Sequence, residues 1–216
     1  MRLSKSTIEV LKNFSTINQG IIFKPGNVLR TMSVMRNMFA RAVIKDDIPQ
    51  EFAIYDLPEF LSTISLFEDA EIEFAEKHLI IKSPSAGNKI KYFYSNPSVI
   101  VAPPDKEMKM KGENIALMIT EDHISQIQRA SGVMKLKELS FNKEGVTCFN
   151  SSCPGNEFHL NTAVQTDLDA PNVVMKVDDL KVIPAEYDVK IVDGKMINFK
   201  STTAGLDVEY FVAITA

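Results

Sequence analysis

The 216-residue sequence has little of several residue types on which common functions depend. It contains two cysteines, three histidines and no tryptophan. Positive charge is also in deficit, because 24 Lys and Arg stand against 28 Asp and Glu and leave a net charge of −4. A small protein that holds nucleic acid by affinity usually has a basic balance. Any nucleic-acid role of this chain must therefore depend on a local patch or on topology.

Long apolar runs are missing as well. No stretch of about 18 apolar residues occurs, so we expect no transmembrane helix and no membrane partner. The apolar positions of the first segment, MRLSKSTIEV, are periodic rather than continuous, which argues against a signal peptide and for a cytoplasmic protein. Cys148 and Cys153 have no paired histidines nearby, so we predict two unreactive thiols in a reducing compartment rather than a zinc site.

Catalytic patterns are absent too. His78, His123 and His159 are scattered, and none belongs to a metal-binding or nucleophile motif. The run Glu121-Asp122-His123 resembles a chemical cluster, but acidic residues are also typical of the first turn of a capped helix. No Gly-rich phosphate-binding loop occurs. We therefore predict no catalytic residues, no metal and no cofactor.

What is present is a set of short amphipathic helices. Residues 4–18 predict the first, with Ser6 as its cap and Glu9 as the capping-box partner. Its apolar stripe repeats every three residues: Ile8, Leu11 and Phe14. Lys5 and Lys12 are two turns apart, so they lie on one polar face. This helix thus combines a core side with a positively charged side.

Three further helices are predicted. DLPEFLSTISLF begins at the cap Asp56 and exposes Ser62, Thr63 and Ser65 instead of lysines. TEDHISQIQRASG is capped by Thr120 and carries Arg129 nearly opposite its buried side. VDDLKVI predicts a short fourth helix that Pro184 ends.

Strands with period-two patterning fill most of the remaining chain, which places the protein in the α+β class. The stretch PPDKEMKMKG interrupts the pattern with prolines, alternating charge and a final glycine. We therefore predict a first domain at residues 1–103, a linker at 104–112 and a second domain at 113–216.

The two predicted domains look alike. EIEFAEKHLIIKS, from Glu71, matches DVKIVDGKMINFKS, from Asp188, at its apolar positions and at a closing Lys-Ser pair. The first helices of the two halves are separated by nearly the same offset of about 117 residues. A chance likeness of two hairpins is the alternative to duplication of one α+β domain.

Four segments carry a resemblance to a known family: RLSKSTIEVLKNFSTINQGI, FAIYDLPEFLSTISLFEDAEIE, NPSVIVAPP and PAEYDVKI. They resemble the DNA sliding clamps of T-even-type bacteriophages, and the similarity runs along nearly the whole chain. The resemblance implies a closed homotrimeric ring of two similar clamp domains per chain, with helices lining the hole and antiparallel sheets outside. It also implies several partners: double-stranded DNA held topologically, the replicative DNA polymerase, an ATP-driven clamp loader and late-transcription factors. The place of action would be the cytoplasm of the infected bacterial host.

Two groups of residues follow as candidates. The cations expected to face DNA are Lys5, Lys12, Arg129, Lys176 and Lys181, with Arg2 as a possible addition. A few flexible cations would lower the energy of phosphates without fixing a register, and each tight contact would add salt-dependent affinity. By the resemblance, a partner-peptide pocket lies beside the linker and the last strand, with candidates Val101, Pro103, Tyr210 and Phe211. For the cations, the alternative is that they are ordinary solvated residues. For the pocket candidates, the alternative is that they are core residues of their strands. For the whole chain, the alternatives are an enzyme or a monomeric or dimeric protein-binding scaffold.

Overall fold

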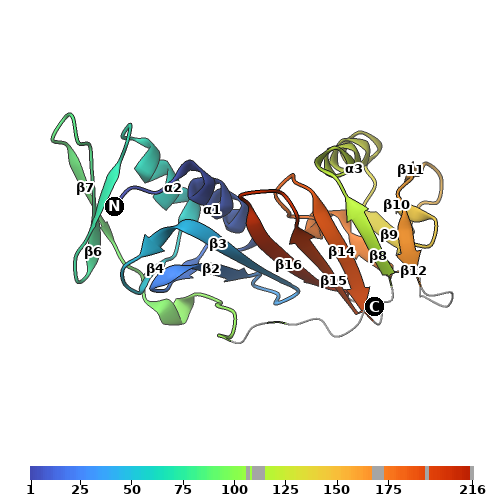
Figure 1. Cartoon of the computed structure of the whole chain (residues 1–216), viewed down its shortest axis with the longest axis horizontal. Helices are drawn as coiled ribbons and strands as arrows, with labels where there is room; N and C mark the ends of the chain where they lie inside the picture. Colours follow the sequence, from blue (N-terminus) through green and yellow to red (C-terminus); the bar gives the residue numbers. More distant parts are fainter. Residues whose placement is uncertain (106–107, 109–114, 167–172, 193–194, 215–216) are drawn as a thin grey trace. The chain divides into compact units, whose positions relative to one another are not determined.

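A computed structural model (Figure 1) describes residues 1–105, 108, 115–166, 173–192 and 195–214. The chain divides into two compact units, unit 1 at Met1–Pro104 and unit 2 at Asp105–Ala216. The predicted linker at 104–112 falls mostly outside the described residues.

Unit 1 contains two helices and seven strands among its described residues. In chain order they are α1 (Lys5–Ile17), β1 (Ile21–Phe23), β2 (Gly26–Met32), β3 (Met38–Ile48), β4 (Phe52–Ile54), α2 (Leu57–Ser65), β5 (Glu71–Phe74), β6 (His78–Lys82) and β7 (Lys89–Phe93), followed by the 3-10 turn η1 (Pro97–Val99). β1 pairs with β4, β2 with β3, and β6 with both β5 and β7, all antiparallel.

The two helices of unit 1 lie side by side, and α1 also packs on β3 (Figure 1). Their inward stripes are fully buried: Leu11 and Phe14 from α1, Leu57 and Phe60 from α2. Aromatic rings extend this core, since Phe23 stacks on Phe52 at 4.4 Å between ring centroids and meets Phe60 edge-on at 6.4 Å. The core therefore fixes which faces of α1 and α2 remain exposed.

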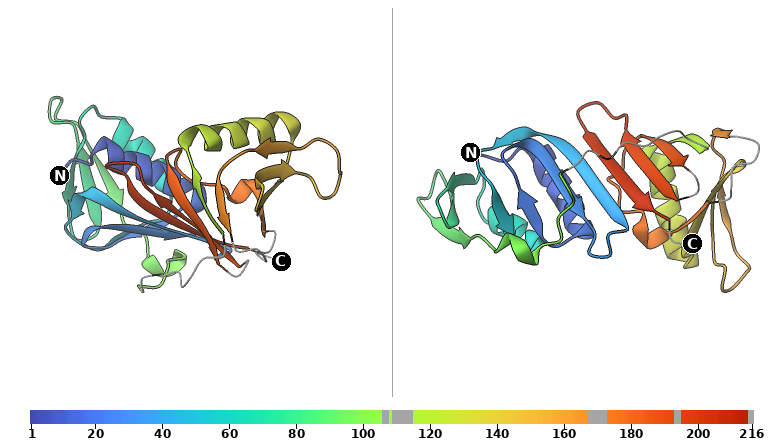
Figure 2. Two further views of the ribbon diagram at one scale, coloured as in Figure 1. Left: turned by 45° about the vertical axis from the view of Figure 1, so that its right-hand side comes forward. Right: turned by 90° about the horizontal axis from the view of Figure 1, so that it is seen from below.

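Unit 2 has one α-helix and nine strands among its described residues. They are β8 (Ile115–Ile119), α3 (Glu121–Met134), β9 (Glu138–Asn142), β10 (Gly145–Phe149), β11 (Phe158–Leu160), β12 (Val164–Thr166), β13 (Val173–Lys176), the 3-10 turn η2 (Val177–Asp179), β14 (Tyr187–Val192), β15 (Met196–Ser201) and β16 (Asp207–Ala213). Within this unit the strand orders are β11-β10-β9-β13 and β12-β8-β14-β15-β16, all antiparallel. α3 covers the side of the first group that includes β10 and β11 (Figure 2).

The two units follow the same strand plan. The β1–β4 pair of unit 1 corresponds in chain order to the β9–β13 pair of unit 2, and β5-β6-β7 corresponds to β14-β15-β16. Met1 and Ile72 of β5 each donate a hydrogen bond to the carbonyl of the other, so the start of the chain lies beside β5. In unit 2, β8 pairs with β14 in the same way. The α+β class and the antiparallel sheets predicted from the sequence are confirmed.

Two predictions about helices were wrong. The N-cap of α1 is Ser4 rather than Ser6, because the Ser4 hydroxyl accepts the Thr7 N–H and is itself bonded to Asp46. The predicted fourth helix is only the three-residue turn η2, which has no side-chain cap. The residue before a proline avoids the α conformation, so Pro184 leaves too few residues for a helix.

Candidate nucleic-acid interface

The exposed side of α1 carries two of the predicted cations. Lys5 and Lys12 are both exposed, whereas Val10, Leu11 and Phe14 are buried on the other side of the helix. Lys5 opens the helix and Lys12 lies two turns later. The structure thus brings these two cations together on one face, and the core fixes that orientation.

Asp46 of β3 anchors the start of this helix. Its Oδ2 accepts the Ser4 backbone N–H at 2.9 Å and the Ser4 hydroxyl at 2.8 Å. Burial alone would raise the pKa of Asp46, but hydrogen bonds from Thr7 and Ser4 outweigh burial, so the pKa lies below its ordinary value of 3.8. A carboxylate at a helix N-terminus also complements the helix dipole. The α1 face is therefore positioned by a contact from a strand 42 residues away in sequence.

The exposed side of α2 is different because it presents hydroxyl groups and no lysine or arginine. The hydroxyls of Ser62, Thr63 and Ser65 donate to the carbonyls of Pro58, Glu59 and Ser62, all within the helix. These donors are already occupied, so α2 offers phosphates no free hydroxyl proton without losing an internal bond. This agrees with the sequence pattern, which places Ser62, Thr63 and Ser65 on that face instead of lysines.

In unit 2, Arg129 is exposed on α3, and Ile124 and Ile127 are buried on the other side. The Arg129 Nε donates weakly, at 3.4 Å, to the Ser125 carbonyl one turn earlier. Thr120 caps the helix as predicted, and its partner in the capping box is His123. The cluster formed by Glu121, Asp122 and His123 is thus the first turn of a helix.

The other three predicted cations lie elsewhere. Lys176 ends β13 on the sheet face opposite buried Val173 and Met175, and it pairs in register with Glu138. Lys181 follows η2 and is partly buried. Arg2 is exposed and forms ion pairs with Glu71 at 3.2 Å and Asp69 at 3.9 Å. None of these three cations belongs to an α-helix.

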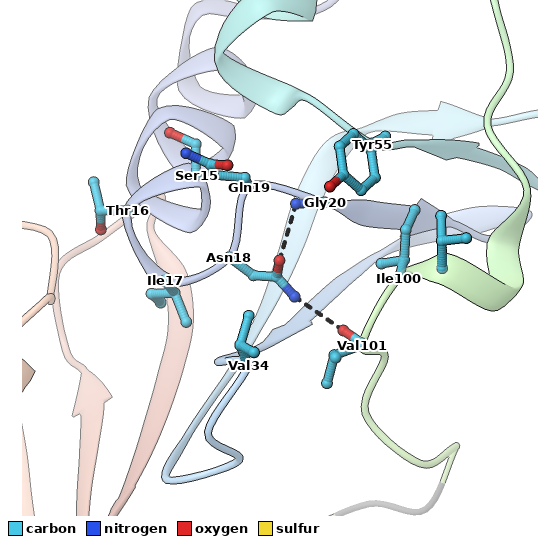
Figure 3. Close-up of a pocket in the computed structure, with 11 residues that line it drawn as sticks. Ser15, Thr16, Ile17, Asn18, Gln19, Gly20, Val34, Tyr55, Ile100 and Val101 are labelled. Atoms are coloured by element: carbon cyan, nitrogen blue, oxygen red, sulfur yellow. Dashed lines mark hydrogen bonds between the residues drawn. The ribbon is translucent and has the colours of Figure 1, made fainter.

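A pocket of about 400 Å³ opens in unit 1 at the end of α1 (Figure 3). The buried side chain of Asn18 connects the backbone segments around this pocket. Its Nδ2 donates to the carbonyls of Met32 and Val101, and its Oδ1 accepts the Gly20 N–H. Three apolar side chains around it are more than half exposed: Val34, Tyr55 and Val99. Exposed apolar groups gathered around a pocket are typical of a binding site.

The predicted pocket residues are only partly brought together. Val101 lines this pocket, and Pro103 follows two residues later without lining it. Tyr210 and Phe211 are buried at 0% and 3% exposure, and the Tyr210 hydroxyl accepts the Ile183 N–H. Both side chains are thus inaccessible within the described structure, as the strand-core alternative has it.

The exposed rim residues were not among the predicted candidates. Val34, which lines the pocket, and its neighbour Met35, which does not, occupy the tight turn between β2 and β3 and are 68% and 85% exposed. Apolar residues in a turn are a signal that sequence reasoning could have used. The contribution of Tyr55 and Val99 depends on three segments converging, which no local pattern reveals.

The described residues contain neither a cluster suited to bind a metal ion nor a helix suited to span a membrane. No cluster of three or more His, Cys, Asp or Glu suited to a metal occurs among the described residues. No helix of the described residues is long and apolar enough to cross a membrane. Cys148 is buried and Cys153 exposed, and neither forms a disulfide. Burial raises the pKa of the Cys148 thiol.

Several known proteins are similar to this chain in sequence or in fold. A family model described as DNA polymerase processivity factor matches residues 4–102. The sliding clamp of Vibrio phage KVP40 is 31% identical over an alignment of 235 positions that covers 100% of both chains. The sliding clamp of Escherichia phage RB69 is 29% identical, covering 100% of this chain and 97% of that one. The sliding clamp of Enterobacteria phage T4 is 31% identical, covering 87% and 85%.

A solved structure extends the likeness of fold. Proliferating Cellular Nuclear Antigen from Entamoeba histolytica matches with a TM-score of 0.69, covering 100% of this chain and 98% of that one at 9% identity. That likeness concerns the fold alone, whereas the phage relatives match in sequence over 85% to 100% of their length. The chain therefore belongs to the family of phage sliding clamps, DNA polymerase processivity factors that are non-catalytic scaffolds and not enzymes.

Proposed function

We propose that three copies of this chain form a ring that encircles duplex DNA and tethers the replicative polymerase. The observation that carries the proposal is the full-length similarity to phage sliding clamps. The charge distribution supports it, because a chain of net charge −4 exposes Lys5, Lys12 and Arg129 on its longest helices. A ring of this kind remains on DNA by enclosure, so it needs only weak phosphate contacts.

Ring closure requires an interface between copies, and two unpaired strand edges support one. Among the described residues, β7 at the edge of unit 1 and β11 at the edge of unit 2 each pair on one side only. β7 exposes Phe93 at 66%, and exposed edges are prone to uncontrolled pairing unless another chain covers them. We infer that β7 of one copy pairs with β11 of the next.

The unit 1 pocket suits a partner's apolar tail. Val34, Tyr55, Val99 and Val101 would bury the apolar side chains, and the carbonyls at the end of α1 would accept backbone N–H groups. We infer that the polymerase docks there, and that the clamp loader and late-transcription factors compete for the same pocket. The ATP-driven loading step belongs to the loader. All of this takes place in the cytoplasm of the infected bacterium.

The oligomeric state is the first test. Light scattering should give a mass near three times the 24.2 kDa of one chain. A monomer or dimer at every concentration would exclude the ring. The ring loaded on circular DNA should then remain bound at high salt and leave once the circle is cut, whereas an affinity binder stays on linear DNA.

The helix faces can be tested separately from assembly. Replacing Lys5 and Lys12 together with Glu should weaken loading on DNA and DNA-dependent stimulation of the polymerase, because like charges repel the phosphates. The mass of the assembly should not change. The matched control reverses Lys24 and Lys45, two exposed lysines outside the helices of unit 1. If both variants loaded equally well at physiological salt, the assignment of the α1 face to the DNA interface would be wrong.

A further inference from the structure

The turn after α3 contains a lysine in a backbone conformation that lysine rarely adopts. Lys135 is the C-cap of α3, with φ 56° and ψ 38° in the left-handed region. Glycine is strongly preferred at such helix ends because a Cβ raises the energy of this conformation. Strained positions of this kind are concentrated at functional sites. A lysine here also complements the helix dipole, which is the purely structural explanation.

A single side chain holds this turn in place. Asn150 Nδ2 donates to the Lys135 carbonyl at 3.1 Å, and Asn150 Oδ1 accepts the Lys137 N–H at 2.9 Å. The Lys137 N–H also reaches the Phe149 carbonyl at 3.2 Å. The backbone of two neighbouring lysines is therefore fixed, while their side chains are exposed.

No acidic side chain of the described residues pairs directly with these two lysines, although the pKa of Glu138, lowered mainly by hydrogen bonds from Ser151, is lowered further by the charge of Lys137. No ion pair within 4 Å joins Lys135 or Lys137 to an acidic side chain of the described residues. The nearest acid in sequence, Glu138, is engaged elsewhere, because its two carboxylate oxygens accept the Ser151 N–H at 2.6 Å and the Ser151 hydroxyl at 2.8 Å. Arg129 lies roughly 9 Å before Lys135 along the α3 axis, from the helical rise.

We propose that Lys135 and Lys137 bind phosphates of duplex DNA and continue the contact begun by Arg129. The inference rests on the proposed function, in which α3 faces the duplex. Phosphate binding explains why a lysine occupies this left-handed position. Glycine would fit the backbone conformation better but would carry no charge. It also supplies unit 2 with cations on the helix side, which Lys176 does not provide from the opposite sheet face.

The test measures binding of the intact protein to a short linear duplex by fluorescence anisotropy over a range of low salt concentrations, where enclosure cannot hold the protein and only phosphate contacts contribute. Lys135→Gln and Lys137→Gln should each weaken binding at low salt and lower the salt slope by about 0.9 for each phosphate that is no longer neutralised. Lys135→Arg should bind like the wild type. Lys143→Gln is the matched control, because Lys143 is exposed at the other end of β9 and its replacement removes the same charge.

Thermal unfolding separates this contact from a structural cap. Lys135→Gly should raise the melting temperature by about 2–4 °C, because strain is relieved, while DNA binding weakens as in Lys135→Gln. If Lys135→Gly melts lower and binds DNA like the wild type, the lysine is a cap and the proposal is overturned. Equally weakened binding in Lys135→Gln and Lys143→Gln would overturn it too, by showing an effect of net charge alone.

The Lys5 and Lys12 reversal distinguishes failure of this inference from failure of the proposed function. If that reversal weakens loading and the Lys135 and Lys137 variants do not, only the turn is wrong. If none of these variants affects DNA, the proposed encirclement of DNA by these helix faces fails with it.

Discussion

Units 1 and 2 share a strand plan but differ in the segment that joins β4 to β5 and β13 to β14. In unit 1 that segment is the nine-residue helix α2, and in unit 2 it is the three-residue turn η2. α2 begins with a side-chain cap from Asp56 and a proline in its first turn, and both favour a helix start. η2 has no side-chain cap and is followed by Val182, Ile183 and Pro184.

This difference shows that the shared strand arrangement depends on which side chains fill the core rather than on the length of the connecting helix. α2 fills its part of the core with Phe60, which is 1% exposed and packs against Phe23 and Tyr92. Beside η2, Leu180 and Val182 are buried at 6% and 3%. The single turn η2 can therefore replace a helix, because the smaller side chains of Leu180 and Val182 complete the core of unit 2. The helical surface is then concentrated on α1 and α2 in unit 1 and on α3 in unit 2.

The largest predicted effect comes from removing the aromatic anchor of α2. Phe60→Ala should lower the free energy of unfolding by about 3–5 kcal/mol, because it deletes a buried ring from a packed aromatic cluster. Leu180→Ala should cost about 2 kcal/mol, at the low end for a buried leucine, since a short turn can relax around the gap. Urea unfolding of the two variants measures the difference. Equal destabilisation would mean that η2 supports its unit as strongly as α2 does.

Two glycines sharpen the comparison at the level of the backbone. Gly145 and Gly26 both have positive φ, 125° and 105°, but only at Gly145 would a Cβ meet backbone, 2.6 Å from the Leu160 carbonyl oxygen. Gly145→Ala should cost roughly 3 kcal/mol from strain and overlap together, and Gly26→Ala about 1 kcal/mol from strain alone. Thermal melts of both variants provide the measurement. A larger destabilisation by Gly26→Ala would contradict the expected tight approach of β10 to β11.

Much of this architecture could be predicted from local pattern. The three-residue spacing of Leu11 and Phe14 and the caps Asp56 and Thr120 placed α1, α2 and α3, and period-two alternation placed the main hairpins. The exposed positions of Lys5, Lys12 and Arg129 followed from their angle to the apolar stripe. These features depend only on neighbours within about two turns of the chain.

The errors involve contacts between distant segments. Local pattern favours Ser6 because Glu9 follows three residues later, but the contact of Ser4 with Asp46 on β3 makes Ser4 the cap. The unit 1 pocket needs the end of α1, the β2–β3 turn and the 99–101 segment to meet, so only Val101 among its lining residues was predicted. The strained Lys135 has no sequence signal, because a lysine after a helix is ordinary until its φ is known.

Helix caps give a smaller difference between the units. Ser4→Ala should cost about 1–2 kcal/mol, because Ser4 caps α1 and also bonds to Asp46, and Thr120→Ala about 1 kcal/mol, because that cap has only local partners. Ser6→Ala, which removes only the 3.1 Å contact between the Ser6 and Ser4 hydroxyls, is the control within α1 and should change stability by less than about 0.5 kcal/mol. Chemical denaturation of the three variants checks the order. A Ser6→Ala effect as large as that of Ser4→Ala would contradict the assigned cap.

The smallest effect is a pH dependence confined to the anchor of α1. Hydrogen bonds hold the pKa of Asp46 below 3.8 despite partial burial, so the carboxylate stabilises the fold fully above that value. As pH falls through the lowered pKa, the folded state must protonate Asp46 and this contribution disappears. Asp46→Asn should therefore be less stable than the wild type by about 1 kcal/mol near neutral pH, and the two should converge below about pH 4.

Urea unfolding of both proteins across this pH range measures the convergence, and Asp47→Asn, at the exposed neighbouring position, is the control. Other carboxylates titrate in both proteins, so their effects cancel in the difference. α3 has no carboxylate anchor of this kind among its described contacts, because its cap is completed by His123 in the same turn. Relative to the intrinsic exchange rate at each pH, the protection of amides in α1 should therefore fall in acid by a larger factor than the protection of amides in α3. If the stability difference between wild type and Asp46→Asn were instead constant from neutral to acid pH, the Ser4 contact would not depend on the charge of Asp46, and α1 and α3 would be held equally by local capping alone.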